Sequence, residues 1–369
     1  MISIVIPTYK EADSIQETIR RSAASLSQSG EEYELIVVDD ESSDGTAELA
    51  EKLSAEFPVR VLRRVGRRGL ATAVIDGWNI ARGDVLGVID ADLQHPPEIL
   101  KSLAVALRGD NADVAVASRY VQGGGTSDWN WMRRFISWGA THLAATVLPL
   151  TLSEVSDPMS GMFVVRATAI AGEQLSPLGY KILLEVLAKG HIQKIVEVPY
   201  QFEERTRGSS KLGPRQYGEY VAHLLRLAWS TGQFAAWIEY SLVGLTGAAI
   251  DLGIVHWTVE RGWPVVWAVL VAVQAALLWN FLWNQWVTFP QRKRGVGSSE
   301  KTFARLALYE RICAPGAILN VLLTLLLAGE GMRVLLAAAA GVIADGLVNL
   351  FFNIPAIWKV WGSANLHSE

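Results

Sequence analysis

The stretch from Val85 to His95 reads VLGVIDADLQH. It begins as an apolar, strand-like run and ends in two carboxylates, Asp90 and Asp92, with one residue between them. Polar side chains directly after a buried parallel strand lie at the carboxyl edge of the sheet, where open α/β sheets bind their ligands. Carboxylate oxygens in this arrangement suit Mg²⁺ or Mn²⁺ bound together with a diphosphate. The stretch therefore predicts a metal and diphosphate site, with a helix-capping aspartate beside a solvated one as the alternative.

Four further runs of β-branched and apolar residues have the same strand-like character. They are Ile2–Ile6, Leu35–Val38, Val59–Leu62 and Val114–Ala117. Most are followed by helix-compatible segments, and this alternation predicts a mainly parallel sheet with helices on both faces. The N-terminal half is therefore expected to be an α/β domain.

Acidic residues also follow two of these other runs. Asp39-Asp40 comes directly after the run at 35–38, and Pro7-Thr8-Tyr9-Lys10-Glu11 ends the first run. Clustered carboxylates repel one another unless a cation or hydrogen-bond donors lie between them. Three acidic strand ends in one domain therefore indicate a ligand site, at which Asp39 and Glu11 are expected to contact a nucleoside.

The overall composition excludes several classes of protein. The formal net charge of -4 argues against a nucleic-acid binder that is held by phosphate neutralisation. Cys313 is the only cysteine, so neither an intramolecular disulfide nor a cysteine-based zinc site can form. The chain begins directly with strand-like residues and lacks the basic start and apolar core of a signal peptide.

The composition changes near residue 235, where long apolar stretches rich in Ala, Leu, Val and Trp begin. Each stretch is close to the ~20 residues that cross a bilayer, and four spans in two hairpins are expected at about 237–259, 263–288, 306–328 and 333–358. The segment 290–305 between the hairpins is basic, which predicts a cytoplasmic loop. An even number of crossings then places the N-terminal domain and both termini in the cytoplasm.

Polar side chains within the spans are expected to face the helix bundle, because polar groups in hydrocarbon are costly. They are Asp251, Gln274, Asn280, Asn284, Asp345, Asn349 and Asn353. Hydrogen bonding between helices and a role in handling lipid both remain open for them.

Two stretches outside the spans have an apolar helical face. Residues 214–235 directly precede the first span, and they are predicted to form an interfacial helix on the membrane surface. Residues 129–148 have a similar face, and both an interfacial helix and an ordinary core-facing helix remain open for them.

Several motifs occur in a fixed order over about residues 2–212. They are Pro7-Thr8-Tyr9-x-Glu11, Val37-Val38-Asp39-Asp40, Asp44-Gly45-Thr46, Arg68-Gly69-Leu70, Asp90-Ala91-Asp92-Leu93-Gln94-His95-Pro96-Pro97-Glu98, Ser118-Arg119-Tyr120, Asp157-Pro158-x-Ser160-Gly161 and Phe202-x-x-Arg205-x-x-Gly208-x-Ser210-Lys211-Leu212. By these motifs the chain resembles the family 2 glycosyltransferases of GT-A fold, and specifically the dolichol- or polyprenol-phosphate mannose synthase group. Through Asn280-Phe281-x-x-Asn284-x-x-x-Thr288-Phe289 its C-terminal half resembles the four-span GtrA-like domain.

The resemblance implies a domain order and a set of site residues. The GT-A domain would occupy 1–213, the interfacial helix 214–235 and the GtrA-like domain 236–362. Metal and donor diphosphate would lie among Asp90, Asp92 and Gln94. The donor nucleotide would also contact Pro7, Tyr9, Glu11, Asp39, Asp40, Ala91 and Lys211, and the acceptor phosphate would contact Arg119, Arg133, Ser137 and Arg205. Lys10 departs from the pattern, since the family usually has Asn at this position.

The reaction that the resemblance implies is inverting, metal-dependent transfer of mannose from GDP-mannose to dolichyl or polyprenyl phosphate. A phosphate acceptor is already anionic near neutral pH, so no general base is required. Three alternatives stay open: transfer of glucose from UDP-glucose to undecaprenyl phosphate, transfer of a UDP-linked amino sugar, and a polyprenyl-lipid flippase whose soluble half only binds nucleotide sugar. A processive polysaccharide synthase is disfavoured, because the sequence lacks a Gln-x-x-Arg-Trp motif. A homo-oligomer also stays open.

Overall fold

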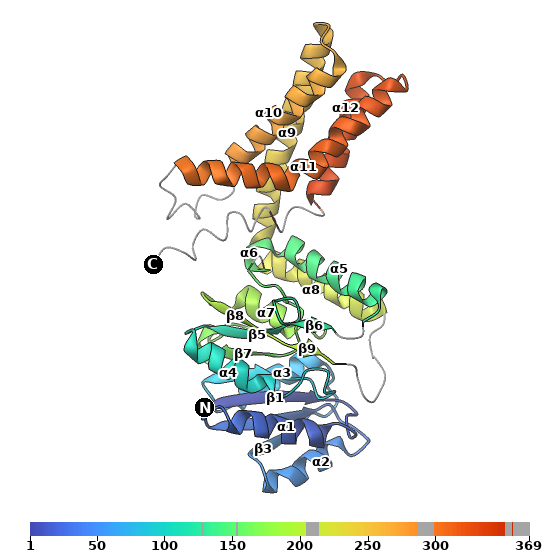
Figure 1. Cartoon of the computed structure of the whole chain (residues 1–369). Helices are drawn as coiled ribbons and strands as arrows, with labels where there is room; N and C mark the ends of the chain where they lie inside the picture. The colour runs from blue at the N-terminus through green and yellow to red at the C-terminus, as the bar shows by residue number, and fades with distance from the viewer. Residues whose placement is uncertain (127–128, 153, 204–213, 286–298, 351–355, 357–369) are drawn as a thin grey trace. The chain divides into compact units, whose positions relative to one another are not determined.

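The computed structural model describes residues 1–126, 129–152, 154–203, 214–285, 299–350 and 356 (Figure 1). The chain forms two compact units. The first consists of residues 1–144 and 155–227, and the second of residues 145–154 and the described residues from 228 onward. The change of composition near residue 235 thus lies close to a structural boundary.

The first unit is built on a seven-stranded sheet of order β3-β2-β1-β4-β7-β5-β8. Its strands are β1 (Ile2–Thr8), β2 (Tyr33–Asp39), β3 (Val59–Arg63), β4 (Val85–Val88), β5 (Val114–Ser118), β7 (Phe163–Arg166) and β8 (Ile195–Pro199). All five strands expected from the sequence are present, and β1, β2, β3 and β4 pair in parallel. The prediction of a mainly parallel α/β sheet is therefore confirmed.

Helices cover both faces of this sheet, as Figure 1 shows. They are α1 (Ile15–Ser27), α2 (Thr46–Lys52), α3 (Leu70–Asn79) and α4 (Ile99–Gly109), followed later in the chain by α7 (Ile182–Lys189). Ile4 and Ile6 point into a core shared with α1 and α4. A Cβ on Gly77 of α3 would come within 2.8 Å of both Val5 methyl carbons on the opposite face. The alternation of side chains along β1 therefore buries both of its faces.

The sequence did not reveal β7, which is antiparallel to both of its neighbours, β4 and β5. Its apolar run follows directly on Gly161, and it joins the sheet between two strands that are distant in the chain. A second, two-stranded sheet pairs β6 (Gly125–Thr126) with β9 (Gln201–Phe202). Strands this short carry too few side chains to show a period in the sequence.

Two long helices join this unit after the sheet's main strands. They are α5 (Trp131–Val147) and α8 (Pro214–Ser230). The hydroxyl of Tyr220 on α8 donates to the carbonyl oxygen of Ala140 on α5 at 2.6 Å. Gly232, with a φ of +71°, lies between α8 and the next helix and interrupts the helical path. The expected interfacial helix at 214–235 thus ends at Ser230.

The second unit contains α6 (Pro149–Leu152), α9 (Gln233–Glu260), α10 (Val265–Trp283), α11 (Ser299–Gly329) and α12 (Val334–Val348). Among the described residues, α9, α10 and Thr302–Gly329 of α11 are long and apolar enough to cross a membrane. Helix α12 is apolar but 15 residues long, and most of the remainder of the fourth expected span lies outside the described residues. Four spans are therefore supported in part.

Contacts among these helices follow the two expected hairpins, with α9 against α10 and α11 against α12. Polar side chains link the helices, as expected from the cost of exposing them to hydrocarbon. Asn320 Nδ2 on α11 donates to Asp251 Oδ2 on α9 at 3.2 Å, and Gln274 Nε2 on α10 donates to Glu310 Oε1 on α11 at 2.8 Å. Interhelical hydrogen bonding is confirmed for Asp251 and Gln274, whereas Asn353 lies outside the described residues.

Candidate active site

The carboxyl ends of β2, β1 and β4 lie side by side, because β1 is the middle strand of the three. Thr8 is in register with Asp39, and Ile89 N donates to Val5 O at 3.1 Å directly before Asp90. The segments that carry Tyr9, Asp39 and Asp90 therefore leave the sheet at one edge, as the sequence predicted.

Asp39 is almost fully buried and is held by three donors. Its carboxylate accepts from Thr8 Oγ1 at 3.0 Å, from Ser42 N at 2.8 Å and from Ser42 Oγ at 2.6 Å. The Ser42 hydroxyl also accepts from Lys10 N at 2.8 Å. Asp39 and Ser42 thus fix the loop that carries Tyr9 and Glu11.

Lys10 occupies a left-handed backbone position with a φ of +58°. Asparagine tolerates this region better than most other residues with a Cβ. The Asn that the resemblance implies at this position would suit this backbone conformation, whereas Lys10 adopts it with local strain. Its ammonium lies 5.6 Å from the Tyr9 ring centroid, and the guanidinium of Arg68 lies 4.6 Å from the same ring. Cations thus gather around Tyr9.

Asp40 takes part in a different contact. Its Oδ1 lies 2.7 Å from Arg64 Nε in a buried ion pair, and its Oδ2 accepts from Gly69 N at 2.8 Å. Burial raises the pKa of the Asp40 carboxyl, although the Gly69 amide and Arg64 oppose the rise. This carboxylate ties the start of α3 to the sheet, and its contact with a nucleotide stays a prediction.

Asp90, Ala91, Asp92 and Gln94 follow β4 in a tight loop. Asp92 Oδ1 accepts from Gln94 N at 3.1 Å, which sets the direction of the Asp92 side chain. The Gln94 side chain donates to Glu203 O at 3.4 Å, and Glu203 N donates back to Gln94 O at 3.0 Å. The two carboxylates and the amide are partly exposed, whereas Ala91 is buried.

His95 supports this loop from inside. Its ring stacks on Tyr200 with centroids 5.4 Å apart and meets Phe202 edge-on at 5.4 Å, and its Nδ1 lies 3.7 Å from Asp90 Oδ2. Burial lowers the pKa of His95 to about 4, so the imidazole is neutral at pH 7. Gly161 abuts the same carboxylate, since a Cβ there would lie 2.6 Å from Asp90 Oδ2 and 3.0 Å from His95 Cε1.

Arg119 forms a buried bidentate ion pair with Asp157. Its Nε and Nη2 each lie 2.7 Å from one carboxylate oxygen, and its backbone N–H donates to Asp157 at 3.0 Å. The guanidinium lies 5.3 Å from the ring centroids of Tyr120 and Trp129 and 5.6 Å from that of Phe202. Asp157 had no role assigned from the sequence, and its contact with Arg119 spans 38 residues.

Lys181, which the sequence did not single out, interacts electrostatically with Asp90 and Asp157. Its Nζ donates to Met159 O at 2.6 Å, within the segment 157–161 that reaches Asp90. Burial lowers the pKa of Lys181 to about 8 and Arg119 acts in the same direction, while the Asp90 and Asp157 carboxylates oppose the shift. The sequence contains no motif around Lys181 that would single it out.

A cavity of about 620 Å³ lies beside Arg119. Its lining consists of Tyr120, Thr126, Trp129, Arg134, Trp138, Thr141 and Ser156. Tyr120 hydrogen-bonds Ser137 at 2.9 Å, and the guanidinium of Arg133 lies 4.4 Å from the Trp129 ring centroid. Ser137 and Arg133 thus contact lining residues of this cavity without lining it themselves, whereas Arg205 and Lys211 lie outside the described residues.

Both halves of the chain match a known protein family. Residues 3–171 match Glycosyl transferase family 2, and residues 239–358 match the GtrA/DPMS transmembrane domain.

Three relatives give the match more detail. A dolichol-phosphate mannosyltransferase from Pyrococcus furiosus is 38% identical over 97% of this chain and 99% of that protein. A dolichol-phosphate mannosyltransferase from Saccharomyces cerevisiae is 37% identical over 61% of this chain and 86% of that protein. An undecaprenyl-phosphate mannosyltransferase from Micrococcus luteus is 36% identical over 60% of this chain and 91% of that protein.

The first of these relatives matches across both units, so the likeness extends from the acidic sheet edge to the apolar helices. This chain therefore belongs to the dolichol-phosphate mannosyltransferase group of the family 2 glycosyltransferases, and it is a glycosyltransferase with a GtrA-type membrane domain.

Proposed function

We propose that the protein transfers mannose from GDP-mannose to a polyprenyl or dolichyl phosphate, with inversion at the anomeric carbon. The observation that carries this proposal is a continuous set of contacts from the acidic sheet edge to the cavity. Gly161 touches Asp90, Asp157 of the same segment pairs with Arg119, and Arg119 lies against Tyr120 and Trp129 of the cavity wall. A donor at the edge and a lipid phosphate in the cavity would thus meet near this segment.

The acceptor side of the proposal follows from the chemistry of the cavity. Aromatic walls suit an isoprenoid chain, and arginine is the side chain best suited to bind a phosphate. Arg134 lines the cavity, and Arg133 and Ser137 contact its lining residues Trp129 and Tyr120. A phosphate monoester is largely ionised near neutral pH, with a second pKa of about 6, so orientation and charge screening matter more than a general base.

A divalent metal fits the side chains at the donor end. Asp90 and Asp92 offer carboxylate oxygens and Gln94 an amide oxygen, which is the ligand type that Mg²⁺ and Mn²⁺ prefer. Within the described ranges, no group of three or more His, Cys, Asp or Glu side chains is placed to hold a metal ion alone. We therefore expect diphosphate oxygens to complete the coordination. When bound, the metal would neutralise charge on the departing nucleoside diphosphate.

The remaining steps are assigned to the chain's own residues. Tyr9, Glu11 and Asp39 would hold the nucleoside, and the 157–161 segment with Lys181 would hold the sugar beside Asp90. An acceptor phosphate oxygen, held by Arg133 and Ser137, forms a bond to the anomeric carbon as the bond from that carbon to the diphosphate oxygen breaks. Attack from the face opposite the leaving group inverts the configuration.

We also propose that the catalytic domain lies on the cytoplasmic side, with domain limits at 1–213, 214–235 and 236–362. The basic segment 290–305 supports this orientation, because Lys and Arg are enriched in cytoplasmic loops. The exposed side chains of Trp131, Phe135 and Trp229 on α5 and α8 suit a membrane interface.

Product formation tests the proposed function. The purified full chain in liposomes would receive polyprenyl phosphate, Mn²⁺ or Mg²⁺, and radiolabelled GDP-mannose or UDP-glucose in parallel. A mannolipid made only from GDP-mannose and lost on chelation is the expected result. A glucolipid would show that the donor is UDP-glucose instead of GDP-mannose. The absence of a lipid product with every nucleotide sugar would overturn glycosyl transfer to lipid.

The close approach of Gly161 to Asp90 gives a first prediction. A Gly161→Ala variant forces a shift of the Asp90 carboxylate or the His95 ring, because the new Cβ would lie 2.6 Å from Asp90 Oδ2. Such overpacking costs roughly 1–3 kcal/mol, so affinity for Mn²⁺ in the presence of GDP should fall about tenfold or more. Electron paramagnetic resonance of free Mn²⁺ measures this directly.

Gly109→Ala is the matched control, because a Cβ at Gly109 would meet nothing within 4 Å. Unchanged Mn²⁺ affinity in both variants would contradict a metal site at Asp90.

Lys181 gives a second prediction. A Lys181→Met variant keeps the length of the side chain but removes its charge, and a hydrogen bond to a charged group contributes about 1.5–3 kcal/mol. The KM for GDP-mannose is therefore expected to rise at least about tenfold, with the KM for lipid phosphate unchanged. Lys52→Met on the exposed end of α2 is the control. An equal rise in the KM values of both substrates would argue against a donor-specific role.

A further inference from the structure

We propose that His223 of α8 is a positioning residue that fastens the loop 178–181 and thereby places Lys181 at the donor site. This inference rests on the proposed role of Lys181 in holding the donor. Through this contact, α8 would support the donor site as well as carry an exposed apolar face.

The central contact joins α8 to the loop. His223 is fully buried, and its Nδ1 accepts a hydrogen bond from Leu178 N at 3.1 Å. An acceptor nitrogen carries no proton, so in the neutral ring the proton is on Nε2. That nitrogen lies 3.4 Å from Glu185 Oε2 on α7. The imidazole therefore lies between the loop 178–181 and α7, in the tautomer with the proton on Nε2.

A second set of contacts fixes the start of the loop. Glu185, fully buried, accepts from Ser176 N at 2.9 Å and pairs with Lys189 at 2.6 Å. Arg226, one turn beyond His223 on α8, donates to Ser176 O and lies 3.9 Å from Glu185. The backbone of Ser176 is thus held by Glu185 of α7 and Arg226 of α8, and the backbone of Leu178 is held by His223 of α8.

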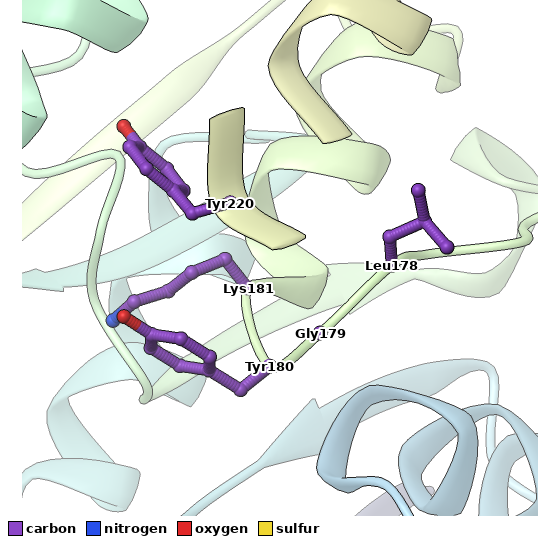
Figure 2. A pocket seen from close by; sticks show the side chains of 5 residues that line it. All are labelled: Leu178, Gly179, Tyr180, Lys181 and Tyr220. Carbon is purple, nitrogen blue, oxygen red and sulfur yellow. The ribbon is translucent and has the colours of Figure 1, made fainter. Parts of the chain in front are cut away.

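The loop carries this constraint to Lys181, which follows Leu178 by three residues. Figure 2 shows the loop from Leu178 to Lys181 together with Tyr220 of α8. Gly179 turns the chain with a φ of +76°, a conformation that favours glycine. Tyr180, Lys181 and Tyr220 of α8 line one small recess, and Lys181 Nζ lies 4.9 Å from the Tyr180 ring centroid. The backbone that carries Lys181 is therefore held by α8 at one end, while its ammonium reaches Met159 O at the other.

The two faces of α8 have different environments. Tyr217, Val221, Leu225 and Trp229 are exposed, whereas Tyr220, His223, Leu224 and Leu227 are buried. An exposed apolar face on a helix that directly precedes the membrane domain in the sequence suits the bilayer interface. The buried face holds the loop, so displacement of α8 would release Leu178 and remove the constraint on Lys181.

The protonation state of His223 is consistent with this role. Burial lowers the pKa of His223 to about 4, Glu185 on α7 opposes the shift, and Arg226 on α8 and Lys189 on α7 add to it. The folded pKa lies below the unfolded value of about 6.5. The contribution of His223 to stability is therefore present above pH 6.5 and is lost as pH falls toward 4.

A pair of substitutions separates the two nitrogens of the ring. In His223→Asn the amide oxygen can take the position of Nδ1 and accept from Leu178 N, whereas in His223→Gln the amide reaches the position of Nε2 and leaves Leu178 N unpaired. We expect amide exchange of residues 176–182 to rise at least tenfold in His223→Gln and to stay near the wild-type rate in His223→Asn. Exchange would be followed by mass spectrometry on the full chain in liposomes.

The kinetic arm tests the link to Lys181. His223→Gln should raise the KM for GDP-mannose several-fold, and adding Lys181→Met should raise it by less than Lys181→Met does alone in the wild-type background. Faster exchange without a change in donor KM would overturn the link, and unchanged exchange in His223→Gln would overturn the positioning role itself. The exchange measurement needs no substrate, so its failure is distinguishable from failure of mannose transfer. If His223→Gln does not fold, faster exchange in His223→Asn would also contradict the proposal.

Discussion

Asp92→Asn is expected to abolish glycosyl transfer, with kcat reduced by about 10³-fold or more. Removing one group that stabilises developing charge costs about 10²–10³ in kcat, and loss of a metal ligand adds weaker metal binding. The asparagine oxygen can still accept from Gln94 N, as Asp92 Oδ1 does at 3.1 Å. The loop after β4 should therefore keep its shape while the charge is lost.

The measurement is transfer of mannose to polyprenyl phosphate by purified protein, together with thermal unfolding. Asp44→Asn is the matched control, because Asp44 Oδ1 accepts from Thr46 Oγ1 at 2.6 Å at the start of α2 and is not assigned to the metal. Lipid translocation is followed in the same liposomes, so that glycosyl transfer and translocation can be told apart. A variant that loses translocation but keeps glycosylation would favour the flippase alternative over the proposed reaction.

Asp157→Ala is expected to produce the largest loss of stability in the catalytic unit. Arg119 is 8% exposed, and its guanidinium and backbone N–H both depend on the Asp157 carboxylate. Removing one partner of a buried ion pair costs roughly 3–5 kcal/mol, because the remaining charge stays buried. For a unit of this size the Tm should fall by roughly 6–20 °C.

Two controls define the cause of that loss. Glu48→Ala removes one of the two carboxylates that pair with the exposed Arg63, and the Tm should hardly change. The double variant Arg119→Met/Asp157→Leu removes both charges and should recover much of the stability without recovering activity. A Tm of Asp157→Ala equal to that of the wild type would contradict a buried, interdependent pair.

Much of the fold could be predicted from local sequence. The apolar runs at β1, β2, β3, β4 and β5 could be recognised as strands, and the acidic residues after three of them mark the sheet edge. The change of composition near residue 235 marks the membrane unit, because crossing a bilayer needs long uninterrupted apolar stretches. These features depend on residues that are neighbours in the chain.

The site could be predicted less completely, because its support comes from distant segments. The antiparallel β7 lies between β4 and β5, and that placement brings the 157–161 segment against Asp90. Asp157 meets Arg119 across 38 residues, and His223 meets Leu178 across 45. No periodicity or spacing in the sequence encodes such pairs.

The sequence by itself thus determined the parallel α/β sheet, the acidic carboxyl edge and the apolar C-terminal half, since each depends on local patterns of apolar and charged side chains. Only the tertiary structure decided that Arg119 is held by Asp157 and that Lys181 reaches the segment beside Asp90. It also decided that His223 of α8 bonds Leu178 in the loop before α7. Buried charges and imidazoles need partners, and the folded chain supplies those partners from elements that are far apart in the sequence.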